Sequence, residues 1–159
     1  MLNEDCRDML RAFSDEGVEC LRIGGFALGA HGYPRATQDI DLWARPRAAN
    51  ADAVLRALKR FGAPLHGLTT DDLQRQDTIF QIGVAPRRID IVTGAAGLEF
   101  EQASRASVDA DIGGIRVRVP SIDDLICNKR AAGRTRDLAD AEALEALKAE
   151  EDSGWDEPR

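Results

Sequence analysis

Two glycines and two aspartates in residues 22–43, RIGGFALGAHGYPRATQDIDLW, limit how this chain can fold. Gly24-Gly25 closes an apolar run, and after a spacer of thirteen residues Asp39 and Asp41 alternate with an isoleucine and a leucine. Side chains at positions i and i+2 share one face of a strand, so both carboxylates project together while the apolar neighbours point into a core. The pattern predicts a strand, a tight turn and a helix, followed by a second strand with two like charges on one face.

The rest of the chain alternates between the periods of strands and helices. Strands are predicted for 18–23, 37–44 and 114–120, and a hairpin that turns at Ala85-Pro86 is predicted for 77–93. Helices are predicted for 3–16, 26–32, 51–62, 98–106, 121–133 and 135–151. Asn3 and Ser121 are residue types that cap helix N-termini. This order predicts an α/β (α+β) fold, in which a mixed β-sheet is flanked by helices.

Length, charge and cysteine content narrow the class of protein. The chain has 159 residues, about the length of one ordinary domain, and we expect a single domain over 1–150 and a polar, frayed tail over 151–159. A net charge of −7 provides no general basic field for binding nucleic acid. The three cysteines lack the spacing of a disulfide framework or a zinc site, which favours a cytoplasmic protein. No apolar stretch approaches the roughly 20 residues of a membrane span, so no membrane partner is expected.

The paired aspartates suggest a metal site. Two carboxylates held close together repel each other unless a cation lies between them. Mg²⁺ is the natural cation, because it prefers oxygen ligands and is commonly held by one or two carboxylates together with substrate phosphates. Asp90, in RRIDIVTG, repeats the pattern of an aspartate between apolar residues and is the candidate third acid, although alone it would fit a solvated strand edge equally well. Asp39, Asp41 and Asp90 together could hold two metal ions that activate an attacking oxygen and stabilise a leaving oxygen.

Gly24 and Gly25 suit a phosphate next to that metal, because a backbone without Cβ atoms can approach a ligand closely. A pair of glycines alone is most often only a turn. The sequence contains neither GxGxxG nor GxxxxGK[ST], so the residues support neither a Rossmann domain nor a P-loop.

The glycine pair, the thirteen-residue spacer and the run Asp39-Ile40-Asp41-Leu42 resemble the hG[GS] and Dh[DE]h signature of the nucleotidyltransferase superfamily related to DNA polymerase beta. More narrowly, GGFALGAHGYPRATQDIDLW and KRAAGRTRDLADAEAL resemble the small nucleotidyltransferases grouped with the AbiEii toxins. The resemblance spans roughly residues 18–147. It implies a nucleotidyltransferase-like fold in which Gly24 and Gly25 contact the triphosphate, Asp39 and Asp41 bind Mg²⁺, and Asp90 helps to activate the acceptor.

The later motif adds further candidates. By the resemblance, Lys129 corresponds to the lysine of that motif and would neutralise phosphate oxygens, and Asp137 and Asp140 stand where the motif carries two acids. A solvated helix lysine and a helix N-terminal aspartate are equally ordinary explanations for Lys129 and Asp137. Arg35 and Thr37 flank the strand of paired acids, from where they could reach a phosphate or a base.

The function that the sequence favours is transfer of a nucleoside monophosphate from an NTP to a hydroxyl, with release of pyrophosphate. RNA, a protein side chain and a small molecule such as an aminoglycoside or lincosamide all remain open as the acceptor. An antitoxin or another protein partner is expected if the chain acts in a toxin-antitoxin pair. The rival class is a non-catalytic nucleotide-binding or partner module of the same fold, against which the presence of all three aspartates argues.

Overall fold

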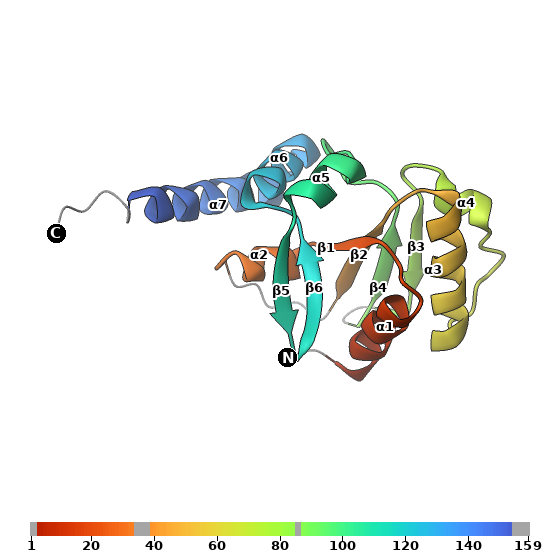
Figure 1. Cartoon of the computed structure of the whole chain (residues 1–159). Helices are drawn as coiled ribbons and strands as arrows, with labels where there is room; N and C mark the ends of the chain where they lie inside the picture. Colours follow the sequence, from red (N-terminus) through yellow and green to blue (C-terminus); the bar gives the residue numbers. More distant parts are fainter. Residues whose placement is uncertain (1–2, 34–38, 85–86, 154–159) are drawn as a thin grey trace.

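The computed structural model describes residues 3–33, 39–84 and 87–153 (Figure 1). Its helices are α1 (Glu4–Asp15), α2 (Gly25–Ala30), α3 (Ala48–Phe61), α4 (Thr70–Gln74), α5 (Phe100–Ala106), α6 (Ile122–Ala132) and α7 (Thr135–Ser153). Its strands are β1 (Cys20–Ile23), β2 (Ile40–Ala44), β3 (Ile79–Ile82), β4 (Ile89–Val92), β5 (Val108–Ile112) and β6 (Ile115–Val119).

Four strands form a mixed sheet in the order β1-β2-β4-β3. The outer pairs β1/β2 and β3/β4 are antiparallel, whereas the central pair β2/β4 is parallel. A separate antiparallel hairpin, β5-β6, lies beside β1 (Figure 1). The expected mixed α/β architecture, a mixed sheet flanked by helices, is confirmed.

The alternation of side chains along β2 separates two cores. Ile40 and Leu42 belong to the larger core, which contains residues of α1 and α3. Trp43 points to the opposite face, where it packs edge-on against Phe100 of α5 with ring centroids 5.2 Å apart. Asp41 shares that second face, because it stands two positions before Trp43 in the strand. Strand β2 therefore buries apolar side chains on both faces of the sheet and carries Asp41 on the face of the smaller core.

Most of the expected elements are present with shifted ends. The Asn3 side chain accepts a hydrogen bond from the Cys6 amide, and the Ser121 side chain accepts one from the Asp124 amide, so both predicted caps are confirmed. The strands of the predicted hairpin pair as β3 and β4, while its turn at Ala85-Pro86 lies outside the described residues.

Two elements escape the sequence reading. The first, α4, has five residues, too few to show a helical period, although Thr69 and Asp72 form a capping box that marks its start. The second, β5, has the sequence VDADI, in which the polar positions of the strand are both aspartates. It pairs with β6 across Gly113-Gly114, and both glycines have the positive φ angles that a two-residue hairpin turn requires.

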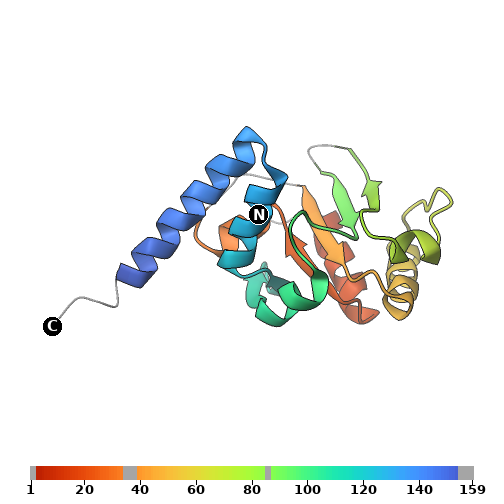
Figure 2. The same ribbon diagram turned by 90° about the horizontal axis from the view of Figure 1, so that it is seen from above.

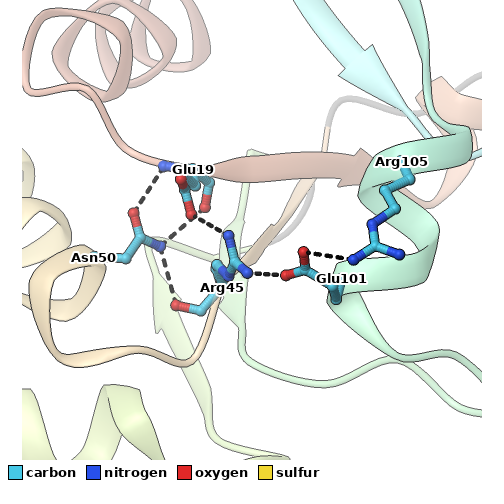
Figure 3. A network of polar contacts seen from close by, with 5 residues as sticks. All are labelled: Glu19, Arg45, Asn50, Glu101 and Arg105. Atoms are coloured by element: carbon cyan, nitrogen blue, oxygen red, sulfur yellow. Dashed lines mark hydrogen bonds and ion pairs between the residues drawn. The ribbon is translucent and has the colours of Figure 1, made fainter.

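A polar network fastens the end of β2 that lies away from Asp41 (Figure 3). The Asn50 side chain accepts from the Glu19 amide at 2.7 Å and donates to the carbonyl oxygens of Glu19 and Arg45 at 2.9 and 3.0 Å. Arg45 also donates to the carboxylates of Glu19 and Glu101, and Arg105 donates to Glu101. The contacts join the start of β1, the end of β2, the start of α3 and α5, so they hold the sheet that positions the acids.

The last helix, α7, extends away from the body of the molecule (Figure 2). Its buried residues, Asp137, Asp140, Ala141 and Leu144, all belong to its first half, which packs against α6. The expected tail over 151–159 is helical as far as Ser153, and 154–159 lie outside the described residues. Among the helices that the structure describes, none combines the length and apolar character needed to cross a bilayer.

Candidate active site

Two of the predicted acids lie side by side in the centre of the sheet. Asp41 on β2 and Asp90 on β4 are register partners on neighbouring parallel strands. Asp41 is also the partner of Ile23, and Asp90 the partner of Gln81, so these four residues form one row across all four strands. Partners in register point to the same face of a sheet, which brings the two carboxyl groups together.

Arg88 joins the third acid to this row. The Arg88 amide donates to Asp39 Oδ1 at 2.9 Å, and its Nε donates to Asp90 Oδ1, also at 2.9 Å. Asp90 is 7 % exposed, so this ion pair compensates a nearly buried charge. Asp39, Asp41 and Asp90 thus lie at one end of the β2/β4 pair. Arg88 donates hydrogen bonds to two of them, Asp39 and Asp90.

The position of Asp41 in this group of acids affects its ionisation. Burial, followed by the charge of Asp90, raises the pKa of Asp41 to about 6; Arg88 partly offsets the shift, and Asp39 adds to it. A carboxyl group with so high a pKa is one whose negative charge lacks compensation in its surroundings. A bound cation would provide that compensation.

The turn after β1 requires glycine at position 24. Its φ angle is +76°, and a Cβ atom built there would lie 2.3 Å from Asp41 Oδ2. A contact under 3.0 Å is a steric clash, so any larger residue would displace the Asp41 carboxylate. Gly25, the next residue, begins α2. The glycine pair and the acid pair predicted from the sequence therefore meet at one point of the fold.

The donor set suits a hard divalent cation, because it consists of carboxylate oxygens. Within the described residues, however, no three His, Cys, Asp or Glu side chains converge closely enough to hold a metal ion as they stand. The contacts explain this arrangement, since Asp90 is turned to Arg88 and Asp39 to the Arg88 amide. The three carboxylates would have to turn toward one point to share a metal ion, and Arg88 contacts one oxygen of Asp90, Oδ1.

The later motif residues form a second cluster between α6 and α7. Lys129 Nζ lies 3.5 Å from Asp137 Oδ1 and 3.4 Å from Asp140 Oδ2. Both aspartates are buried, at 4 % and 1 % exposure. Arg134 Nε donates to Asp137 Oδ2 at 2.7 Å. Burial alone would raise the pKa of Asp137, but the hydrogen bond from Arg134 and the charges of Lys129 and Arg134 lower it. Lys129, Asp137 and Asp140 are therefore a buried ion-pair cluster that links the two helices.

Comparison with known proteins identifies the family of the chain. The sequence profile described as "Nucleotidyl transferase AbiEii toxin, Type IV TA system" matches residues 9–154. The chain belongs to the AbiEii nucleotidyltransferase family. It is accordingly a nucleotidyltransferase, as the sequence motifs indicated. Among curated proteins, no sequence matches the chain at a significant level.

Solved structures show the same fold as this AbiEii-family chain. TM1012 from Thermotoga maritima, a candidate nucleotidyltransferase, aligns with a TM-score of 0.56 at 14 % identity, over 94 % of this chain and 96 % of that one. ANT(2″)-Ia, crystallised in complex with adenylyl-2″-tobramycin, aligns with a TM-score of 0.55 at 17 % identity, over 94 % and 95 % of the two chains. A solution structure of ANT(2″)-Ia, described there as an antibiotic-resistance factor, gives 0.51 at 16 % identity, over 95 % and 91 %.

The structure thus brings Gly24, Asp39, Asp41 and Asp90 of this AbiEii nucleotidyltransferase into one site, and it groups Lys129 with Asp137 and Asp140. Arg35 and Thr37, the other predicted nucleotide contacts, lie outside the described residues.

Arg88 is the contact that sequence reasoning missed. Its position two residues before Asp90 carried the signal, because i and i+2 share a strand face.

Replacing Lys129 by alanine is expected to destabilise the protein by about 3 to 5 kcal/mol, because it leaves two buried carboxylates without their common cation. Lys59→Ala, on an exposed position of α3, provides the matched control and should change stability by less than about 0.5 kcal/mol. Urea unfolding of both variants measures the difference. Equal midpoints for the two variants would contradict a structural role for Lys129.

Proposed function

We propose that this nucleotidyltransferase is magnesium-dependent and moves a nucleoside monophosphate from an NTP to a hydroxyl acceptor. The observation that carries the proposal is the register of Asp41 beside Asp90 on parallel strands, with Gly24 packed against the Asp41 carboxylate. The uncompensated charge of Asp41, next to the carboxylate of Asp90, favours a divalent cation, and the missing Cβ at Gly24 leaves room for the Asp41 carboxylate.

In this proposal Asp39, Asp41 and Asp90 hold the metal. When bound, Mg²⁺ would neutralise phosphate oxygens and polarise the phosphorus that is attacked. Gly24 and Gly25 leave the backbone open to the triphosphate. Asp90, once released from Arg88, is placed to accept the proton of the acceptor hydroxyl, and the Arg88 guanidinium then becomes available to phosphate. Positioning and charge neutralisation, with no covalent intermediate, account for the catalysis.

Roles at the nucleotide are also proposed for the remaining motif residues. Arg35 and Thr37 would contact a phosphate or the base. Lys129 and Asp137 belong to the buried cluster, and Lys129 retains 14 % side-chain exposure. We therefore propose that the cluster acts mainly by fixing α6 against α7, with Lys129 as the member that can reach a phosphate.

The acceptor has two candidates with separate support. The family description names a toxin of a toxin-antitoxin system, which supports a macromolecular acceptor, either RNA or protein, and an antitoxin partner in the cytoplasm. The structural similarity to ANT(2″)-Ia, whose crystal contains an adenylylated aminoglycoside, supports a small basic acceptor instead. The net charge of −7 favours a cationic drug over RNA.

Incubation of the purified chain with Mg²⁺ and each α-labelled NTP tests the function directly. Parallel reactions contain an RNA pool, a protein extract or tobramycin, and both pyrophosphate release and transfer of label are measured. Label that enters one acceptor identifies it. Absence of pyrophosphate release with every NTP and every acceptor would favour the non-catalytic nucleotide-binding module.

ATP is expected to bind at least about tenfold more tightly with Mg²⁺ than with EDTA, because phosphate oxygens and three aspartates repel each other without a cation between them. Calorimetry at constant ionic strength measures both dissociation constants. Asp109→Asn, on an exposed position of β5, should keep this difference, whereas Asp39→Asn should reduce it. Equal affinity in the two buffers would assign the aspartates a purely structural role.

A further inference from the structure

A cavity lies apart from the three aspartates of the proposed nucleotide site. It has a volume of about 360 Å³ and is enclosed by residues of α1, β1, α5 and β6. This volume falls within the roughly 300 to 1,000 Å³ typical of small-molecule sites. Asp39, Asp41 and Asp90 do not line it. The strand alternation gives the reason: Arg22 and its register partner Leu42 line the cavity, whereas Asp41, next to Leu42, points to the opposite face of the sheet.

The walls of this cavity are positively charged in a chain that is acidic overall. Arg22, Arg45, Arg116 and Arg118 line it, and the acid among the lining residues is Glu19. The chain as a whole has a net charge of −7. Arg45 is already paired with Glu19 and Glu101, and Arg118 Nε lies 4.0 Å from Asp109 Oδ1. Arg22 and Arg116 form no ion pair among the described residues, so they provide the charge that attracts an anion to this cavity.

Arg22 is the unusual member of this group. Its side chain is 1 % exposed, yet Nε, Nη1 and Nη2 have no hydrogen-bond partner among the described residues. The guanidinium stacks on the Phe26 ring at 3.5 Å, which contacts its flat face and leaves the N–H donors at its edge unsatisfied. Burial lowers the pKa of Arg22 to about 10, so the group remains a cation at neutral pH. A buried, unpaired charge is strongly unfavourable and calls for an acceptor.

We propose that this cavity, with Arg22 at its wall, binds a small molecule that carries a phosphate or carboxylate group. An oxyanion offers what the buried guanidinium lacks, because its oxygens match the fork of N–H donors. The Arg22 nitrogens each expose less than 1 Å², so binding of an anion in the cavity requires the guanidinium to turn toward it. Arg116 and Arg118, on alternate positions of β6, add charge from the facing wall. None of the three aspartates lines the cavity, although the negative charge of Asp41 acts on Arg22 and partly offsets the lowering of its pKa.

The test uses the full chain in EDTA, which removes metal-dependent binding at the aspartates. Inorganic phosphate, pyrophosphate and succinate are titrated by calorimetry at constant ionic strength, with sodium chloride as the reference salt, and thermal unfolding is followed in parallel. At least one of these anions is expected to bind and to raise Tm, and the comparison of phosphates with succinate identifies the preferred group. Absence of any effect beyond that of chloride would overturn the proposal.

Three variants locate the binding. Arg22→Met should weaken binding of the anion by at least about tenfold, since a charge-assisted contact is lost. It should also unfold at a higher urea concentration than the wild type without anion, because the unpaired charge has left the interior. Arg116→Met, on an exposed wall position, tests the same site without disturbing the core and should also weaken binding. Arg60→Met, on the exposed surface of α3, should leave binding unchanged. Wild-type affinity in both Arg22→Met and Arg116→Met would overturn the assignment.

Discussion

Asp41→Asn is expected to eliminate nucleotide transfer, lowering kcat by about three orders of magnitude or more, comparable to the loss of a preorganised electrostatic contact in other enzymes. The substitution removes an anionic oxygen but almost no volume, so the fold should persist. Asp109→Asn, an identical chemical change on an exposed strand position, should leave kcat unchanged. Steady-state kinetics on both variants decide the matter, and wild-type turnover by Asp41→Asn would refute a metal-binding role for this residue.

The same variant should be more stable than the wild type when metal is removed. Burial and the nearby acids raise the pKa of Asp41 to about 6, above its ordinary value of 3.8. Between these two values the folded protein binds more protons than the unfolded chain, so stability falls as pH rises toward about 6 and then levels off. A neutral amide at this position avoids the loss, and we expect Asp41→Asn to stabilise the protein by about 1 to 2 kcal/mol at pH 7 to 8 in EDTA.

The advantage of Asp41→Asn should disappear below about pH 4, where Asp41 is protonated in both the folded and the unfolded state. Urea unfolding at pH 4 and pH 8, with and without Mg²⁺, measures it. A variant that is less stable than the wild type at pH 8 in EDTA would show that the Asp41 charge supports the fold instead of opposing it. Combined loss of activity and gain of stability is the behaviour expected of a residue retained for function.

Local patterns in the sequence predicted the parts of the site that depend on neighbouring residues. The alternation around Asp39 and Asp41 is such a pattern, because one strand determines which side chains share a face. The pairing of Asp41 with Asp90 is different, because it depends on β2 and β4 lying parallel and in one register although they are far apart in sequence. Periodicity within a strand contains no information on which strand lies next to it.

Arg88 and Arg22 differ in how far the sequence could predict their surroundings. Arg88 follows the strand rule and could have been assigned to the acids from its spacing to Asp90. Arg22 lies between two apolar residues of a predicted strand, and nothing in the sequence marks its side chain as buried. Its burial follows from the packing of α1 and α2 over β1, including the stacking on Phe26, which depends on tertiary contacts. Likewise, only the contact of α6 with α7 makes Lys129 the common partner of two buried acids.

Gly24→Ala is expected to abolish transfer and to destabilise the protein, whereas Gly29→Ala, five residues later, should do neither. Gly24 has a φ angle of +76° and a ψ angle of −153°, a combination that is almost confined to glycine and costs other residues about 1 to 3 kcal/mol. Its added Cβ would also lie 2.3 Å from Asp41 Oδ2 and 3.2 Å from the carboxyl carbon, so the short Asp41 side chain must move.

Gly29 lies within α2, where an added Cβ meets nothing within 4 Å. Alanine there should stabilise the protein by about 0.5 to 1 kcal/mol, because glycine is the poorer helix former. Measuring kcat and the urea midpoint of both variants separates the loss of an active-site contact from a general effect of changing glycine. The contact between Gly24 and Asp41 links the turn after β1 to the acid on β2, so a single methyl group placed there should disrupt both the phosphate and the metal side of the proposed site. Wild-type turnover in Gly24→Ala would mean that the Asp41 carboxylate can be displaced without cost, which is incompatible with its proposed role as a metal ligand.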